Sequence, residues 1–145
     1  MNTFSNLLDT ELFLELTLRI RSVGNPWLKI SINNHDVACQ FDSTNMLSIH
    51  HKLPLLDPFS IKIELVEKDY MAAHETAAII EQLSIDDFDV VPAWTQLAQY
   101  NNDHNYHDPT NYLGFIGVWQ LLIDRPFYQW THVVTNQGML LQIDQ

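Results

Sequence analysis

The chain has 145 residues, of which 46% are hydrophobic and 11% aromatic. This composition is typical of a folded globular protein and disfavours intrinsic disorder. This length suits a single domain spanning residues 1–145, because a second core would have too little chain. Eighteen Asp and Glu oppose seven scattered Lys and Arg, for a formal charge of −11. Such a surface repels phosphate backbones, so no nucleic acid is expected as a partner.

The N-terminal sequence argues against export and membrane insertion. MNTFSNLLDTELF has an acidic residue where a signal peptide has a basic region, and no apolar run approaches the ~20 residues needed to span a bilayer. The single cysteine, Cys39, cannot form an internal disulfide, which favours a reducing compartment. We expect Cys39 to be a small buried hydrophobic residue.

Residues 12–41 are expected to form three strands. From Leu12 to Ile20, apolar residues alternate with polar or charged ones over much of the segment, which is the period-two pattern of a half-buried strand. After a turn at GNP (24–26), the segment WLKISI (27–32) repeats this pattern. Asn33 and Asn34 tolerate the positive φ of a tight hairpin, and HDVACQF (35–41) alternates again.

The middle of the chain carries clear and ambiguous segments. FSIKIEL (59–65) is a clear strand, NMLSIH (45–50) is a weaker one, and EKDYMAAHE (67–75) is expected to be a loop. TAAIIEQLSIDDFDV (76–90) contains helix formers but also a turn-like Asp pair, and we favour a hairpin. AWTQLAQY (93–100) fits either a short helix or a covering loop.

Three β-rich runs end the sequence: GFIGVWQLLI (114–123), PFYQWTHVV (126–134) and GMLLQI (138–143). About eight or nine short strands separated by turns predict an all-β, two-sheet antiparallel β-sandwich, jelly-roll-like and with little helix. The residues expected in its core are Leu14, Leu16, Leu18, Ile30, Ile61 and Ile63.

Common catalytic motifs are absent from the sequence. Four glycines cannot build a phosphate-cradling loop or a dinucleotide fingerprint, and there is no Gly-x-Ser-x-Gly elbow. His74 and Glu75 begin like a zinc protease helix, but Ala78 stands where the second histidine would lie. The protein is therefore not expected to be an enzyme.

The stretch YNNDHNYHDPTNYLGF (100–115) concentrates polar and aromatic side chains. Asn101, Asp103 and Asn105 place oxygens at alternate positions, as the start of an EF-hand loop does. Tyr106 stands where that loop needs glycine, and Tyr112 stands where it needs glutamate. These two residues exclude an EF-hand.

Other kinds of metal site remain open in this stretch. Asp103 and Asp108, with backbone carbonyls, could bind calcium in another geometry, and calcium is the one cofactor considered. His104 and His107 have a spacing that could chelate zinc on a helix, but the Asp-Pro pair at 108–109 argues against a helix. A solvated polar loop is the simpler alternative.

The tyrosines of this stretch predict a contact surface. Tyr100, Tyr106 and Tyr112 offer flat apolar faces with polar tips, which suit sugar stacking and protein interfaces alike. We expect residues 100–112 to form an exposed loop with Tyr106 and Tyr112 as anchors. The residues expected to supply polar contacts are Asn101, Asp103 and Asn105.

Further aromatic residues lie near the C-terminus. Trp119 alternates with apolar residues and is expected in the core. Tyr128 and Trp130 lie two positions apart in an expected strand, so they could form an exposed aromatic binding strip on one face. The carboxylates of Asp86, Asp87 and Asp89 are expected to form a solvated turn.

Two segments resemble known proteins. LTLRIRSVGNPWLKISINNHDV (16–37) resembles the opening of small calcium-dependent, carbohydrate-binding-module-like β-sandwiches. NYLGFIGVWQLLIDRPFYQWTHVVTNQGMLL (111–141) resembles the ending of small proteins encoded by tailed bacteriophages. The resemblance implies a carbohydrate-binding-module-like fold and a viral origin.

Three functions follow from these observations. The first is a non-enzymatic virion structural or assembly component of the tail, neck or capsid, made in the host cytoplasm and bound to other virion proteins, in several copies or as an oligomer. The second is a carbohydrate-binding module that recognises host-surface glycans. The third is a small metal-dependent hydrolase using His104, His107, Asp103 and Asp108.

Overall fold

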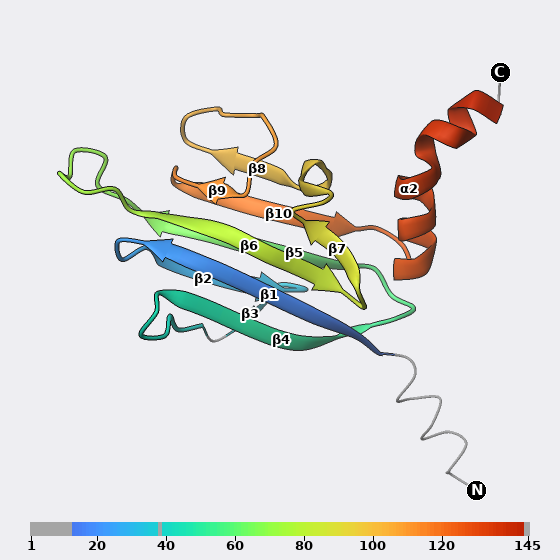
Figure 1. Cartoon of the computed structure of the whole chain (residues 1–145), viewed down its shortest axis with the longest axis horizontal. Coiled ribbons are helices and arrows are strands. Elements are labelled where there is room, and N and C mark those ends of the chain that lie inside the picture. The colour runs from blue at the N-terminus through green and yellow to red at the C-terminus, as the bar shows by residue number, and fades with distance from the viewer. Residues whose placement is uncertain (1–12, 38, 144–145) are drawn as a thin grey trace, which may run out of the picture.

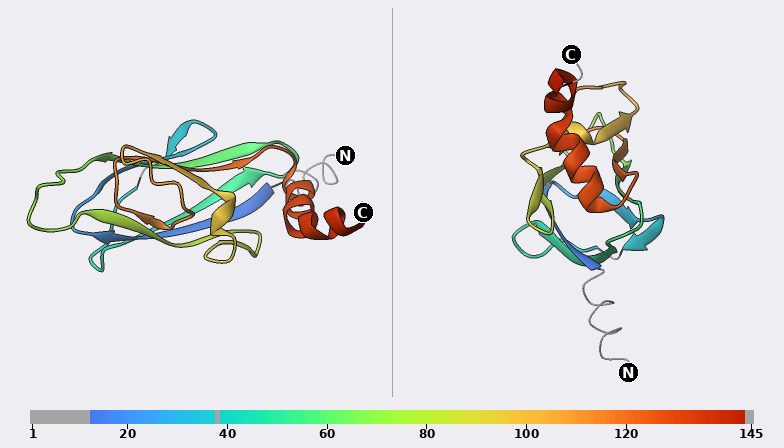
Figure 2. Two further views of the ribbon diagram at one scale, coloured as in Figure 1. Left: turned by 90° about the horizontal axis from the view of Figure 1, so that it is seen from above. Right: turned by 90° about the vertical axis from the view of Figure 1, so that its right-hand side faces the viewer.

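The structure is a computed structural model of the chain, and it describes residues 13–37 and 39–143 (Figure 1). In this part of the chain, ten strands form two antiparallel sheets that pack face to face, with a long helix at one end (Figures 1 and 2). The predicted antiparallel β-sandwich is therefore confirmed.

The two sheets have the following strand orders. The first is β4 (Met46–Pro54), β1 (Phe13–Val23), β6 (Ala77–Ile85) and β7 (Phe88–Val91), with β9 (Tyr112–Leu113) also paired with β6. The second is β3 (His35–Val37), β2 (Trp27–Ile32), β5 (Phe59–Glu67), β10 (Gly117–Ile123) and β8 (Gln99–Asn102).

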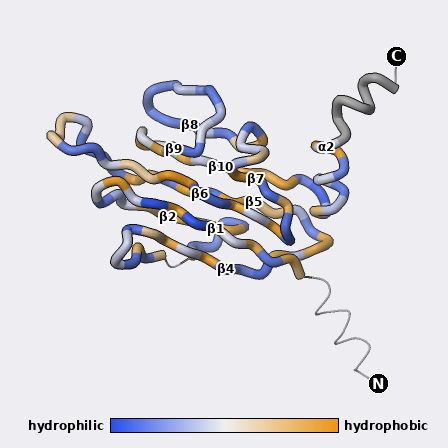
Figure 3. The backbone as a smooth tube through the Cα atoms, in the orientation of Figure 1, coloured by the Kyte–Doolittle hydropathy of each residue, from blue (hydrophilic) through white to orange (hydrophobic). Residues whose placement is uncertain are grey.

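Alternating hydropathy along the strands builds the core. In β1 and β5 every second residue is buried, and the tube in Figure 3 changes colour along these strands accordingly. This alternation points one row of side chains of each sheet toward the other sheet. All six residues predicted in the core are at most 1% exposed: Leu14, Leu16, Leu18, Ile30, Ile61 and Ile63. Trp119, also at 1%, is in the core as predicted.

Both predicted hairpins are present. Asn33 and Asn34 join β2 to β3 with φ values of 53° and 65°, the left-handed conformation that asparagine tolerates well. Asp86 and Asp87 do the same between β6 and β7, with φ values of 47° and 68°. The hairpin favoured for residues 76–90 is thus confirmed.

The remaining early predictions are mostly confirmed. Residues 46–50 of the strand predicted at 45–50 lie in β4, whereas the strand predicted at 35–41 is a strand only at residues 35–37, and residues 39–41 form none. Residues 68–76 connect β5 to β6 without a helix, and a short 3-10 helix, η1 (Thr95–Leu97), precedes β8. Cys39 is only half-buried, although it packs against the core, and this burial raises the pKa of its thiol. Residues 1–12, which include Leu12 and almost all of the segment in which no signal peptide was predicted, lie outside the described residues.

The C-terminal segment corrects the sequence prediction. Residues 127–143 form one helix, α2 (Phe127–Ile143), so the strands predicted at 126–134 and 138–143 are wrong. Phe127 and Trp130 are three positions apart, which places them on one helix side, and both rings pack against Phe88 with centroids 6.0 Å away. Pro126 suits the start of a helix. Tertiary packing here overrides the β propensity of the aromatic residues.

This helix also separates the two residues of the predicted aromatic strip. Residues two apart in a helix point in nearly opposite directions, because each residue turns the helix by roughly 100°. Trp130 is 6% exposed, whereas Tyr128 is 56% exposed and donates a hydrogen bond of 2.9 Å to Asp86. The shared strand face predicted for Tyr128 and Trp130 is therefore wrong.

None of the described helices is long and apolar enough to cross a membrane.

Candidate functional site

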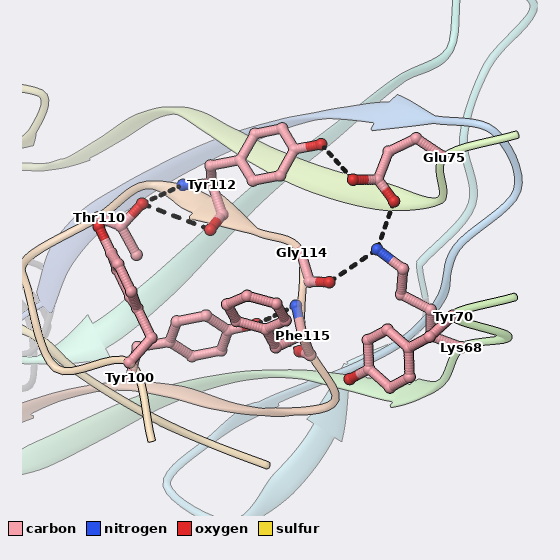
Figure 4. A pocket seen from close by; sticks show the side chains of 9 residues that line it. Lys68, Tyr70, Glu75, Tyr100, Thr110, Tyr112, Gly114 and Phe115 are labelled. Carbon is pink, nitrogen blue, oxygen red and sulfur yellow. Dashed lines mark hydrogen bonds and ion pairs between the residues drawn. The ribbon is translucent and has the colours of Figure 1, made fainter. Parts of the chain in front are cut away.

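A pocket of about 480 Å³ is formed by side chains of three segments (Figure 4). These segments lie toward the end of the sandwich away from α2 (Figure 1). The pocket lies between the loop 68–76, the loop that follows β8, and the segment around β9. Five of its lining side chains are aromatic. The lining residues are Lys68, Tyr70, Glu75, Tyr100, Tyr106, Thr110, Tyr112, Gly114 and Phe115.

Lys68 links the two ends of the loop 68–76. Its side chain is only 7% exposed, and its Nζ forms an ion pair with Glu75 and donates a hydrogen bond of 2.7 Å to the carbonyl of Gly114. The ammonium also lies 5.5 Å from the centroid of the Tyr70 ring. One cation thus joins the two ends of this loop to the segment that precedes β10.

Glu75 and Tyr112 form a second part of the pocket lining. The Tyr112 hydroxyl donates a hydrogen bond of 3.1 Å to Glu75 Oε2 (Figure 4). The hydrogen bond from Lys68 is the main cause that lowers the pKa of Glu75. Burial, followed by the bond to Glu75, raises the pKa of Tyr112. At neutral pH the pocket therefore presents a carboxylate that accepts hydrogen bonds, beside a protonated phenol.

Tyr70 and Phe115 are held in place by the loop after β8. The Tyr70 hydroxyl lies 2.7 and 2.8 Å from the two carboxylate oxygens of Asp103, and it accepts a hydrogen bond of 2.7 Å from the amide of Ile116. His104 stacks on Phe115 with centroids 4.1 Å apart. Hydrogen bonds from His104 and Tyr70 lower the pKa of Asp103.

Tyr100 supports the pocket floor rather than offering a stacking face. It is only 7% exposed, so the exposed face predicted for it is wrong. Its hydroxyl accepts a 2.9 Å hydrogen bond from the amide of Phe115 and donates one to the carbonyl of the same residue. Burial raises the pKa of Tyr100 to about 12. A buried phenol therefore fixes the backbone of Phe115.

Asn102 orders the loop that carries Tyr106. Its Oδ1 accepts hydrogen bonds of 3.1 Å from the amides of His104 and Tyr106, and its Nδ2 donates one of 2.9 Å to the carbonyl of Tyr106. Asn105 turns the chain with φ of 54°. This side-chain-to-backbone network pins a segment that is otherwise exposed.

The structure brings together only some of the predicted contact residues. Tyr106 and Tyr112 both line the pocket and are 42% and 39% exposed. The exposed loop predicted over residues 100–112 is shorter than expected, because residues 100–102 belong to β8 and Tyr112 begins β9. Asn101 therefore lies in a strand and lines a different hollow on the outer face of the second sheet, while Asn105 occupies the turn. Asp103 is not one of the lining residues, and instead it accepts a hydrogen bond from the hydroxyl of Tyr70, which is. Binding by these residues remains a prediction.

The described residues contain no group of three or more His, Cys, Asp or Glu side chains placed to hold a metal ion. Asp103 already contacts Tyr70 and His104, and Asp108 is exposed. The described residues place no third metal-ligating side chain with Asp103 and Asp108, and calcium binding by these two carboxylates remains a prediction from the sequence. His74 lies in a loop, not on a helix.

Sequence reasoning missed the half of the pocket contributed by loop 68–76. Lys68, Tyr70 and Glu75 fall in a segment that was predicted only as a loop, and Phe115 was assigned to a strand. The one available signal was that a lysine, a tyrosine and a glutamate occur within eight residues. Their partners outside this loop are distant in the sequence: Gly114 is 46 positions from Lys68, Asp103 is 33 from Tyr70, and Tyr112 is 37 from Glu75.

Comparisons with known proteins place the fold. No family model and no curated protein sequence matches the chain. The structure of vCBM60 in complex with galactobiose superposes with a TM-score of 0.53 at 12% identity, covering 74% of this chain and 97% of that one. The selenomethionine form of vCBM60, described with a circular permutation that links two families of calcium-dependent carbohydrate-binding modules, gives a TM-score of 0.51 at 11% identity, with coverage of 75% and 90%. The chain therefore has a carbohydrate-binding-module-like fold, as the first resemblance implied.

Proposed function

We propose that the protein is a non-enzymatic carbohydrate-binding module that holds a neutral sugar in the aromatic pocket. The observation that carries the proposal is the joint presence of exposed tyrosine faces and fixed polar groups in one hollow. Tyr106 and Tyr112 line it together with Phe115, and Glu75 is oriented by Lys68.

The chemistry of the pocket suits a sugar. Aromatic rings stack on the apolar face of a pyranose, while a small number of oriented polar groups distinguish its hydroxyls. Glu75 Oε1 already accepts hydrogen bonds from Lys68 and from the amide of Thr76, whereas Oε2 accepts one from Tyr112. Oε2 can therefore accept a further hydrogen bond from a sugar hydroxyl. A volume of about 480 Å³ is within the range of small-molecule sites. The formal charge of −11 disfavours acidic glycans, because like charges repel.

The fold gives independent support. vCBM60 is a carbohydrate-binding module known in complex with galactobiose, and this chain has the same type of β-sandwich. Calcium dependence is described for that group of modules. The proposal for this chain rests on its aromatic and carboxylate groups, with no step assigned to calcium.

The other functions remain sequence-based proposals. A structural or assembly role in a virion would use the same loops against a partner protein, and a viral location rests on the resemblance of residues 111–141 alone. A metal-dependent hydrolase would need His104 and Asp103, which here hold the pocket wall.

A glycan array tests the proposal. It should carry neutral and acidic oligosaccharides, including galactobiose, and should be probed with and without a chelator. We expect capture on neutral glycans that Tyr112→Ala abolishes and Phe13→Ala leaves intact, since Phe13 is 50% exposed but belongs to β1 rather than to the pocket. Binding to acidic glycans alone, or to none, would reject it.

A further inference from the structure

Trp27 is the largest exposed aromatic side chain outside the pocket. It is 59% exposed at the start of β2, where it pairs with Glu67 at the end of β5. The other three tryptophans are less exposed: Trp119 and Trp130 are buried, and Trp94 is half-buried. An indole left largely open to solvent is available to stack on a ligand.

Trp27 lines a second hollow of about 460 Å³ whose other lining residues are polar except for Ile116. The turn at residues 24–26, which precedes Trp27, is packed closely against the loop 68–76. Gly24 has φ of 68°, and a Cβ at that position would lie 2.7 Å from the carbonyl oxygen of Glu75. The lining residues are Asn25, Trp27, Glu67, Lys68, Asp69, Thr76 and Ile116.

The two hollows adjoin. Lys68 lines both of them, and the chain passes directly from one to the other where Glu75 precedes Thr76 and where Phe115 precedes Ile116. Lys68, whose ammonium pairs with Glu75, lies where the two hollows meet. A ligand that extends from the pocket across Lys68 would reach the hollow that Trp27 lines.

We propose that Trp27 forms a second sugar subsite, so that the protein binds a neutral oligosaccharide extending from the aromatic pocket past Lys68. This inference rests on the proposed function and deepens it, because it assigns the ligand class as a chain rather than a terminal sugar. Trp27 stacks on a distal sugar, and the amide of Asn25 and the hydroxyl of Thr76 are the polar groups beside it.

Calorimetric titration with neutral β-linked glucose, galactose, xylose and mannose oligosaccharides tests the subsite, each series supplied as disaccharide and hexasaccharide. We expect the wild type to bind a hexasaccharide at least about fivefold more tightly than its disaccharide, as a stacking contact of ~1 kcal/mol implies. Trp27→Ala should remove this gain and leave disaccharide binding unchanged. Trp27→Phe should restore part of it, and Phe13→Ala should retain it in full.

Indole N–H resonances provide a second readout in the unaltered protein. The chain has four tryptophans, and Trp27→Phe identifies the Trp27 signal by its loss. That signal should shift with a hexasaccharide and not with a disaccharide. An unchanged hexasaccharide affinity in Trp27→Ala, or an equal loss for both lengths, overturns the subsite while the proposed function stands. Failure of the wild type to bind any of these sugars overturns both.

Discussion

The hydroxyl of Tyr112 donates a hydrogen bond of 3.1 Å to Glu75, a residue 37 positions earlier in the chain. The same carboxylate pairs with Lys68, whose side chain is almost fully buried. Strand β9 and the loop 68–76 are thereby joined through one acidic side chain. The shape of the pocket therefore depends on long-range polar contacts as well as on the sandwich.

Replacing Lys68 by methionine should destabilise the fold by about 1–3 kcal/mol. The substitution keeps the apolar stem but removes a charged hydrogen bond to the buried residue Gly114, whose carbonyl loses its partner. Lys62→Met is the matched control, because Lys62 donates a hydrogen bond of 3.2 Å to the exposed Asn34, and it should change stability by less than ~0.5 kcal/mol. Urea unfolding measures both, and equal effects would mean that Lys68 is not a structural cation.

Tyr100 should make stability depend on pH in the alkaline range. Its pKa is raised from 10.0 to about 12, so the folded state favours the protonated phenol. The stabilising contribution is complete below pH 10 and is lost as the pH rises through the folded pKa near 12. Tyr100→Phe should be less stable at neutral pH, because the bonds to Phe115 are lost, but should show a flatter decline.

Ultraviolet titration of tyrosinate checks the same prediction directly. The difference between the wild-type and Tyr100→Phe titrations should isolate a step near pH 12. A step at pH 10 would show that the phenol is solvated in the folded protein.

Leu16→Ala should cost roughly 2–5 kcal/mol of stability, because Leu16 is 1% exposed between the two sheets and its truncation leaves a cavity. Phe13→Ala on the same strand should stay within about 0.5 kcal/mol, since Phe13 is half exposed. Chemical denaturation of the two variants is the measurement. A loss of a few tenths for Leu16→Ala would place this residue on the surface.

The strands were predictable because their signals are local. Period-two hydropathy in β1 and the asparagine pair at the β2–β3 turn need no knowledge of distant residues. Helix α2 was not predictable, because its aromatic residues favour strands intrinsically and only packing of Phe127 and Trp130 on Phe88 decides the outcome.

The candidate site divides in the same way. Tyr106 and Tyr112 could be singled out from the composition of one stretch, and both line the pocket. Lys68 and Glu75 could not, because their roles come from contacts with Gly114 and Tyr112 across the fold. Periodicity and composition carry no information on which distant loops meet at one end of a sandwich.

Sugar stacking on Tyr106 is the central claim, and calorimetric titration of Tyr106→Ala with the best-bound oligosaccharide of the array tests it most directly. Tyr106 is 42% exposed and lines the pocket, so its truncation removes contact area and leaves the core intact. We predict an affinity loss of more than ~1 kcal/mol with a nearly unchanged Tm. Unaltered affinity together with a large fall in Tm would contradict the claim and make Tyr106 a structural residue.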